Sequence, residues 1–167
     1  MPLMRNDAFV ADPFRLIADD EAIPAAGDII VPLARIEEAE SRLASAKGKL
    51  GIHVPNTVKP ESLTHLFNEI ALISVAFPAF NDGRGFSIAR RLRRNGFTGI
   101  LRATGPLIVD QYAYAKACGF DEIDVPEALA ARQGVDQWKK GASAISVSYQ
   151  RGYARPSTIL DRRRAAH

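Results

Sequence analysis

The feature that most constrains the fold is an alternation of short apolar runs with longer stretches that have helical periodicity. The apolar runs lie at residues 28–31, 50–54, 71–77 and 99–103, and residues 120–125 are expected to form a fifth strand. The stretches with helical periodicity lie at residues 33–46, 60–67, 87–95, 107–118, 127–132 and 136–144. Apolar strands that alternate with helices are typical of a parallel sheet with right-handed crossover connections. We therefore expect an α/β fold with a parallel sheet of about five strands.

Length limits how such a sheet can close. The chain has 167 residues, whereas a closed eight-stranded α/β barrel typically needs about 250. We expect instead an open doubly wound sheet or a partial barrel, formed by a single α/β domain at residues 28–150. Residues 1–27 and 151–167 lack clear periodicity, so we expect an N-terminal extension and a basic, mobile C-terminal tail. Residues 145–149 fit either the end of a helix or a further strand.

Composition narrows the class of protein. Cys118 is the only cysteine, so no intramolecular disulfide can form, and we expect a buried structural thiol in a cytoplasmic protein. No apolar stretch is long enough to span a membrane. The net charge of +3 comes largely from arginines at 90–94 and 162–164, without any nucleic-acid-binding motif. No metal is expected, because the histidines are isolated and a charged strand at the sheet edge explains the acidic residues at 121–124.

The loop between the third apolar run and the next helix carries the strongest functional signal. Ligands of parallel α/β sheets bind beyond the carboxyl ends of the strands, which is where this loop lies. The residues of interest are Asn81, Asp82, Gly83, Arg84, Gly85 and Ser87. Glycines and a helix N-terminus suit an anion, and an arginine can add a bidentate contact. We predict an anion-binding or substrate-binding site here; the alternative is an ordinary turn in which Asp82 pairs with Arg84.

Arg102 is the one charged residue of the fourth apolar run. A buried arginine cannot lose its charge and must be paired. Asp110 or Gln111, in the following helix, is one expected partner. Asp82 is the other, and that pairing would join the two loops, including Gly105, into one polar site. The alternative is that Arg102 extends into solvent at the strand end.

Four arginines crowd the helix that follows the glycine-containing loop: Arg90, Arg91, Arg93 and Arg94. The expectation is a solvated helix face, with a docking surface for an acidic partner as the functional alternative. The loop before this helix does not complete the dinucleotide-binding glycine pattern, and no phosphate-binding P-loop motif occurs in the chain.

The motifs also carry a family resemblance. They are the stretch 77–93, FPAFNDGRGFSIARRLR, followed by GILRATG at 99–105, by Asp110-Gln111 and by CGFD at 118–121. Over about residues 28–150 the chain resembles the bacterial domain-of-unknown-function family nine-three-four. The resemblance implies genes beside those of assimilatory sulfite reduction and members labelled as oxidoreductases, so it implies a pathway rather than a reaction.

Three functions follow as expectations. The leading one is an accessory protein of assimilatory sulfate or sulfite reduction, whose polar residues bind a small anion. The second is a non-enzymatic module that docks on sulfite reductase or its electron donor through the arginine-rich helix. The third is an oxidoreductase that uses flavin or nicotinamide. The residues leave open whether the protein is an enzyme, which cofactor it uses and its oligomeric state.

Overall fold

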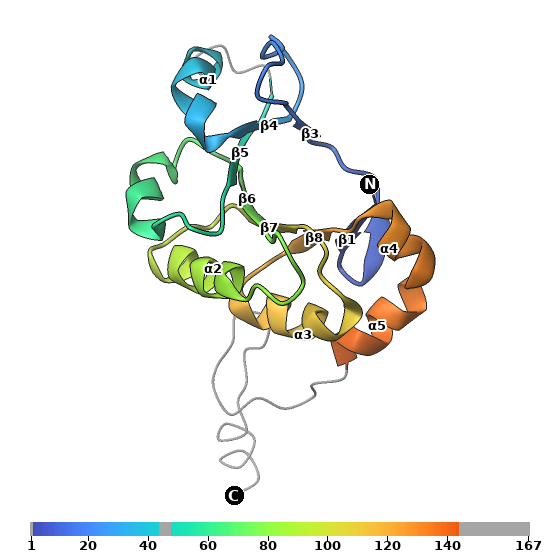
Figure 1. Ribbon diagram of the computed structural model, residues 1–167. Coiled ribbons are helices and arrows are strands. Elements are labelled where there is room, and N and C mark those ends of the chain that lie inside the picture. Colours follow the sequence, from blue (N-terminus) through green and yellow to red (C-terminus); the bar gives the residue numbers. More distant parts are fainter. Residues whose placement is uncertain (1, 44–47, 144–167) are drawn as a thin grey trace, which may run out of the picture.

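The computed structural model describes residues 2–43 and 48–143. One curled sheet forms its centre (Figure 1). The strands are β1 (Leu3–Arg5), β2 (Ala8–Val10), β3 (Arg15–Leu16), β4 (Ile29–Pro32), β5 (Leu50–Val54), β6 (Leu72–Ala76), β7 (Ile100–Thr104) and β8 (Glu122–Asp124). The α-helices are α1 (Ile36–Leu43), α2 (Arg84–Arg94), α3 (Val109–Cys118), α4 (Glu127–Arg132) and α5 (Val135–Ser143). Two 3-10 helices, η1 (Leu33–Arg35) and η2 (Pro60–Leu66), complete the described elements.

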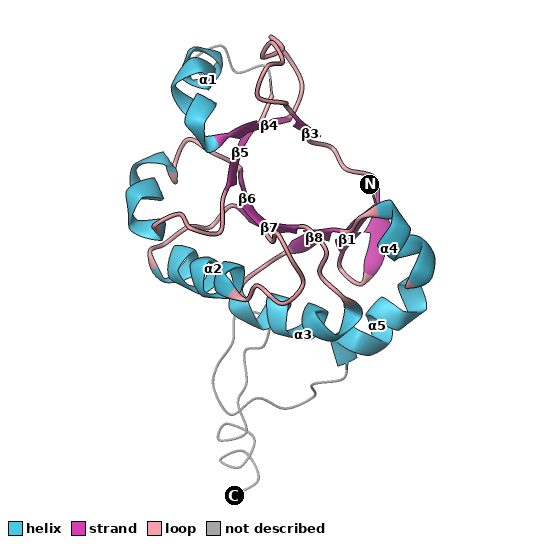
Figure 2. Cartoon of the chain, viewed as in Figure 1, coloured by secondary structure: helices cyan, strands magenta, loops and turns pink. Residues whose placement is uncertain are grey.

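The strands follow the order β2-β1-β8-β7-β6-β5-β4-β3. Strands β3 to β8 run parallel, and each pairs with the next strand in the chain. Strand β1 is antiparallel to both β8 and β2. Figure 2 shows the helices along the outer side of the curve, so the sheet has a convex face covered by helices and a concave face. The architecture is an open half-barrel.

The partial barrel, one of the two expected architectures, is the one observed, and the five predicted strands are β4 to β8. The count was low because the first sixteen residues, expected to lie outside the sheet, contribute β1, β2 and β3. These strands are only two or three residues long, which is too short to produce a recognisable alternation of apolar residues.

The helix predictions are largely confirmed, with shifted ends. Helix α2 begins at Arg84 rather than Ser87, so part of the predicted loop is helical. The segment at 60–67 is the 3-10 helix η2, with Pro60 in its first turn. Residues 145–149 and the expected C-terminal tail lie outside the described residues. In the part of the chain that is described, no helix combines the length and apolarity needed to cross a membrane.

The N-terminal segment explains why the sheet curls. Residues 11–14, which we call the strap, connect β2 and β3, and these are the two edge strands. In a flat eight-stranded sheet the edge strands would lie about 34 Å apart, since neighbouring strands are spaced by about 4.8 Å. The strap can span at most about 18 Å. The edges must therefore approach one another, and the strap crosses the open side of the half-barrel (Figure 1).

The main core lies between the convex face and the helices. Alternate strand residues such as Ile52, Ile73, Leu101 and Ile123 contribute to it and are at most 1% exposed. Because side chains of a strand alternate between faces, the residues between them point to the concave face. There, Phe14 of the strap packs on Ile30 and Leu72 near the amino-terminal ends of the strands. The carboxyl-terminal half of the concave face carries polar side chains instead.

Candidate functional site

The predicted loop between β6 and α2 folds around the carboxylate of Asp82. Arg84 donates from Nε to Oδ1 at 3.0 Å and from Nη2 to Oδ2 at 2.6 Å. The backbone N–H of Arg84 also donates to Oδ1, and the amide of Asn56 donates to Oδ2 at 2.6 Å. The hydrogen bonds from Arg84 are the largest cause that lowers the pKa of Asp82 to about 2. The structure thus shows the alternative interpretation, a turn in which Asp82 pairs with Arg84. The carboxylate of Asp82 occupies the hydrogen-bond donors that an anion would use.

The glycines of this region serve backbone packing. A Cβ on Gly85 would lie 2.4 Å from the ring of Phe77. Gly105, with φ of +138°, would place a Cβ 2.0 Å from the carbonyl oxygen of Phe77. Both glycines let the backbone pass close to Phe77, whereas Gly83 is the N-cap of α2 and its Cβ position is more open.

Gln111 joins the two predicted loops. Its Nε2 donates to the carbonyl oxygen of Phe80 at 2.6 Å, and its Oε1 accepts from the backbone N–H of Ile108. The first contact holds the β6–α2 loop, and the second caps the start of α3. Asp110 is exposed in the first turn of α3. The structure therefore brings the two loops together through an amide side chain.

Arg102 lies elsewhere, on the concave face, and is 2% exposed. Its Nε donates to Glu122 at 2.7 Å, and its two terminal nitrogens donate to the carboxylate of Asp12 at 2.6 and 2.7 Å. The expected partners Asp82, Asp110 and Gln111 were wrong, and so was the alternative of extension into solvent. The reason is the strand register: Arg102 points to the concave face, whereas the helix that carries Asp110 and Gln111 covers the convex face (Figure 2).

Glu122 links Arg102 to a second arginine. Arg5 of β1 donates from Nε to Glu122 at 2.7 Å, and its Nη2 contacts the same oxygen. The ring of Phe14 lies 5.8 Å from the guanidinium carbon of Arg102. We call Arg5, Asp12, Arg102 and Glu122 the concave ion cluster. Its two positive and two negative charges balance, so it fastens the strap to the sheet without leaving a free cation for an anion.

A chain of three polar side chains crosses the neighbouring strands on the same face. The Nδ1 of His53 lies 3.0 Å from the Oγ of Ser74, which lies 2.7 Å from the Oγ1 of Thr104. We call this set the hydroxyl chain. Ser74 is 2% exposed, while His53 and Thr104 are half-buried. Burial lowers the pKa of His53, which favours the neutral imidazole.

Asp124 ends β8 beside this chain and is in register with Thr104. It is 8% exposed, and no described residue donates a hydrogen bond to its carboxylate. Burial raises the pKa of Asp124, Asp12 and Glu122 raise it further, and Arg102 and the terminal amino group oppose the shift.

The expectation that residues 121–124 form a charged sheet edge was wrong, because β1 pairs with β8 and buries Glu122 and Asp124. Over residues 2–43 and 48–143, no three His, Cys, Asp or Glu side chains are grouped to hold a metal ion.

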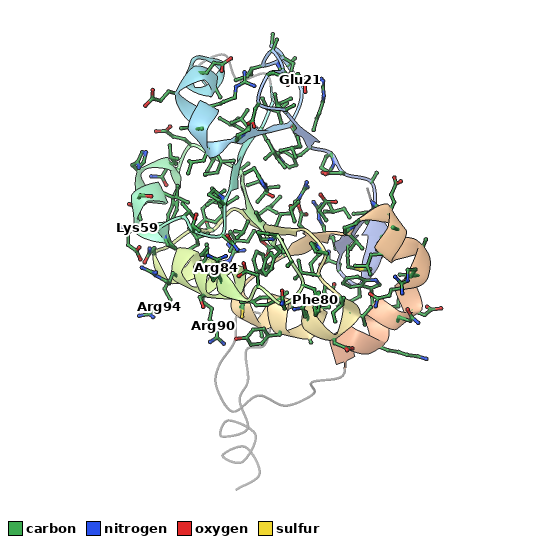
Figure 3. The ribbon with its side chains drawn as sticks, viewed as in Figure 1. Glu21, Lys59, Phe80, Arg84, Arg90 and Arg94 are labelled. Carbon is green, nitrogen blue, oxygen red and sulfur yellow. The ribbon has the colours of Figure 1, made fainter. Side chains whose placement is uncertain are left out.

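The arginine-rich helix presents most of its cations to solvent. Arg84, Arg90, Arg91 and Arg94 are exposed, and Figure 3 shows Arg90 and Arg94 extending away from α2. Arg91 pairs with Glu61 at 2.7 Å. Arg93 differs, since its side chain is 12% exposed. It donates to three backbone carbonyl oxygens and to Asp121, and thereby holds α2 against the loops before β7 and β8.

The remaining features carry less functional weight. A cavity of about 620 Å³ lies at the amino-terminal ends of β7 and β8, opposite to the edge where parallel α/β sheets bind ligands. Its cations Arg5, Arg93 and Lys116 are paired with Glu122, Asp121 and Asp7.

Cys118 is fully buried, and burial raises the pKa of its thiol, which confirms the expected structural cysteine.

Sequence comparison decides the family. A family model described as bacterial protein of unknown function (DUF934) matches residues 51–160. The chain belongs to this family. The DUF934 match contains the hydroxyl chain, Arg102, Asp124 and the whole of α2, whereas the strap with Asp12 precedes it. Comparisons with curated proteins and with solved structures find no match.

The sequence interpretation missed the polar residues of the concave face. A signal for them exists, because His53, Ser74, Arg102 and Thr104 interrupt apolar strands, and Arg102 and Thr104 do so two positions apart, on one face. Asp12 had no such signal, since it lies 90 positions from Arg102 in a segment without periodicity.

Proposed function

We propose that this DUF934 protein is an accessory protein of assimilatory sulfate or sulfite reduction, and that it acts by docking on an acidic partner. Sulfite reductase or its electron donor is the proposed partner. The resemblance of the chain to its family supports the pathway, and the geometry of α2 supports docking.

The observation that carries the docking proposal is the position of the arginines on α2. Arg84, Arg91 and Arg94 are spaced by seven and three residues, so they share one side of the helix, with Arg90 next to them. All four are exposed. Asp82 and Glu61 pair with Arg84 and Arg91, but the four exposed arginines outnumber these two carboxylates. A surface with such an excess of positive charge attracts an oppositely charged partner and steers its approach.

Two exposed aromatic residues flank this cationic side. Phe80 is 55% exposed and Tyr114 is 45% exposed. The guanidinium carbon of Arg90 lies 6.0 Å from the centre of the Tyr114 ring, and Tyr114 packs on Phe86 at the start of α2. Figure 3 shows Phe80, Arg84 and Arg90 in the same region. Aromatic and arginine side chains are enriched at protein interfaces, which supports a partner protein over a solvated surface.

A small anion at residues 81–87 is the second proposal. The N-terminus of α2 and the exposed guanidinium of Arg84 support it. Asp82 competes with it, because its carboxylate already accepts from both the backbone and the side chain of Arg84. A calorimetric titration with sulfite shows whether an anion can bind at Arg84 despite Asp82. Sulfite binding that Arg84→Gln abolishes supports the anion site, and the absence of any heat of binding rejects it.

The docking proposal is tested with purified sulfite reductase from the same organism and the variant Arg90→Gln/Arg91→Gln/Arg94→Gln. Exposed ion pairs contribute about 0.2–1 kcal/mol each, so we expect about tenfold weaker binding from three lost cations. Binding of the unchanged protein should weaken steeply as salt rises. Arg93 is left unchanged because it holds the fold.

The matched control removes three exposed cations from α4 and α5, as Arg132→Gln/Lys139→Gln/Lys140→Gln. It should bind like the unchanged protein, because these residues lie on other helices. Equal loss in both variants, or binding that salt does not affect, contradicts the proposal. The pathway is tested separately with a deletion strain: growth on cysteine but not on sulfate supports it, and normal growth on sulfate overturns it.

A further inference from the structure

Beside the exposed arginines of α2, the fold leaves aromatic side chains open to solvent. Among the described residues, four large hydrophobic side chains are at least 37% exposed: Val10, Leu16, Phe80 and Tyr114. Val10 and Leu16 lie on the short edge strands β2 and β3. Phe80 and Tyr114 lie instead in the β6–α2 loop and on α3. The exposed aromatic surface therefore borders the cationic surface proposed for docking.

Hydrogen bonds fix the backbone of the loop on both sides of Phe80. The carbonyl oxygen of Phe80 accepts from Nε2 of Gln111 at 2.6 Å. The carbonyl oxygen of Ala79 accepts from the backbone N–H of Asp82 at 3.1 Å, and the carboxylate of Asp82 is held by Arg84. A residue whose backbone is fixed before its partner arrives loses less conformational entropy on binding. The loop therefore presents Phe80 in a preformed position.

Gln111 also brings Phe80 close to Tyr114. Gln111 and Tyr114 are three residues apart on α3, so their side chains emerge from the same side of that helix. The ring of Tyr114 packs on Phe86 of α2 with 5.0 Å between ring centres, and the guanidinium carbon of Arg90 lies 6.0 Å from the centre of the Tyr114 ring. The two exposed aromatic side chains thus belong to one surface that α2 and α3 share.

Charged and apolar groups of such a surface contribute differently to binding. Exposed ion pairs are weak and are screened by salt, and exposed charges at an interface act mainly on the association rate. Differences in the lifetime of related complexes come mainly from well-packed anchors, among which aromatic residues are enriched. The arginines of α2 therefore account for attraction of a partner, but a long-lived complex needs an apolar contact as well.

We propose that the acidic partner places one apolar side chain against Phe80 and Tyr114, and that this contact sets the lifetime of the complex. The matching surface of the partner is then a group of carboxylates around an exposed aliphatic or aromatic residue. Gln111 is a positioning residue, because it holds the loop that carries Phe80. This inference rests on the proposed docking function, since it concerns the same surface.

The test measures association and dissociation rates of the full chain on immobilised sulfite reductase. Phe80→Ala should raise the dissociation rate about tenfold, change the association rate less than twofold and leave its salt dependence unchanged. Arg90→Gln/Arg91→Gln/Arg94→Gln should instead lower the association rate and its salt dependence. The matched control is Leu16→Ala, at a 49% exposed side chain on the edge strand β3, and it should change neither rate.

Gln111→Glu tests positioning apart from stability. Its carboxylate can still accept from the backbone N–H of Ile108 at the start of α3, but it has no N–H for the carbonyl oxygen of Phe80. We expect a several-fold faster dissociation with little change in thermal stability. In the background of Phe80→Ala, the same substitution should not change the dissociation rate further, because the anchor that it positions is already absent. Additive effects of the two substitutions would remove Gln111 from this role.

Competition with synthetic peptides tests the chemistry of the partner. Two five-residue peptides of equal charge carry a leucine or a serine between two pairs of glutamates. The leucine peptide should block docking at a several-fold lower concentration than the serine peptide, and Phe80→Ala should abolish this difference. Equal inhibition of the unchanged protein by both peptides overturns the proposed apolar contact.

The rate measurements separate failure of this inference from failure of the docking function. A normal dissociation rate in Phe80→Ala, with binding that depends on the arginines, overturns the aromatic anchor alone. Absence of binding between the unchanged protein and sulfite reductase or its electron donor overturns the docking function and this inference with it. An equal increase of the dissociation rate in Leu16→Ala also overturns the anchor, because the effect would then not depend on the surface next to α2.

Discussion

On the convex face of the sheet, aliphatic side chains pack against helices, whereas the concave face carries an ion cluster and a hydroxyl chain contributed by the same strands. In β7, for example, Leu101 enters the helix-covered core and Arg102 binds Asp12 and Glu122. The convex face is stabilised mainly by apolar burial, which is not directional. The concave face depends on specific ion pairs and hydrogen bonds. A residue there can therefore be replaced without a large loss of stability only if its partner is replaced as well.

The largest effect is expected from Arg102→Leu. This substitution leaves Glu122, whose side chain is fully buried, with Arg5 as its one cation in the cluster. Removing one partner of a buried ion pair costs about 3–5 kcal/mol of unfolding free energy. Urea unfolding at neutral pH measures it. Arg102→Leu combined with Glu122→Leu should recover most of the loss, and failure to recover would show that the cluster is not the cause.

Leu101→Ala is the matched substitution on the convex face. A cavity at this fully buried position should cost about 3 kcal/mol. In contrast to Arg102→Leu, no second substitution of a charged residue should restore stability, and the loss should not depend on salt. Urea unfolding at low and high salt makes the comparison. A strong salt dependence would mean that the two faces are not as distinct as their contacts indicate.

Asp124→Asn, unlike the two preceding substitutions, is expected to stabilise the protein at neutral pH. Because the folded pKa of Asp124 is raised above 3.8, the folded protein holds this proton more tightly than the unfolded chain, and stability falls as pH rises through the folded pKa. Asn does not ionise, so the variant avoids this loss of stability. It should be more stable than the unchanged protein at neutral pH and lose that advantage below about pH 3.8. Thermal unfolding across pH measures the difference. Lower stability of the variant at neutral pH would contradict the prediction.

The smallest effect is expected from His53→Gln. Burial lowers the folded pKa of His53 below 6.5, so the unfolded chain takes up a proton first and stability is lost as pH falls below 6.5. The variant should lose stability less steeply between pH 6.5 and the folded pKa. His65→Gln, at an exposed histidine, serves as the control. Parallel pH curves for His53→Gln and the unchanged protein would remove His53 from this role.

The convex face could be predicted from sequence and the concave face largely could not. Strands β4 to β7 are mostly apolar runs of four or five residues that alternate with helical stretches, so local pattern reveals them. The partners of Arg102 come from the strap and from β8, and no local pattern connects these segments. For the same reason, the sequence did not reveal that β8 lies inside the sheet and not at its edge. Its pairing with the antiparallel strand β1 depends on tertiary structure alone.

The pairing of β1 with β8 also has a consequence for synthesis. Leu3 leaves the ribosome long before its partner Asp124, so the strand made first must wait for the strand made last. Contacts so distant in sequence slow folding, and an unpaired edge is prone to association with other chains meanwhile. The half-barrel can therefore close only after translation has passed β8, and a chaperone that shields the waiting strand would raise the yield of native protein.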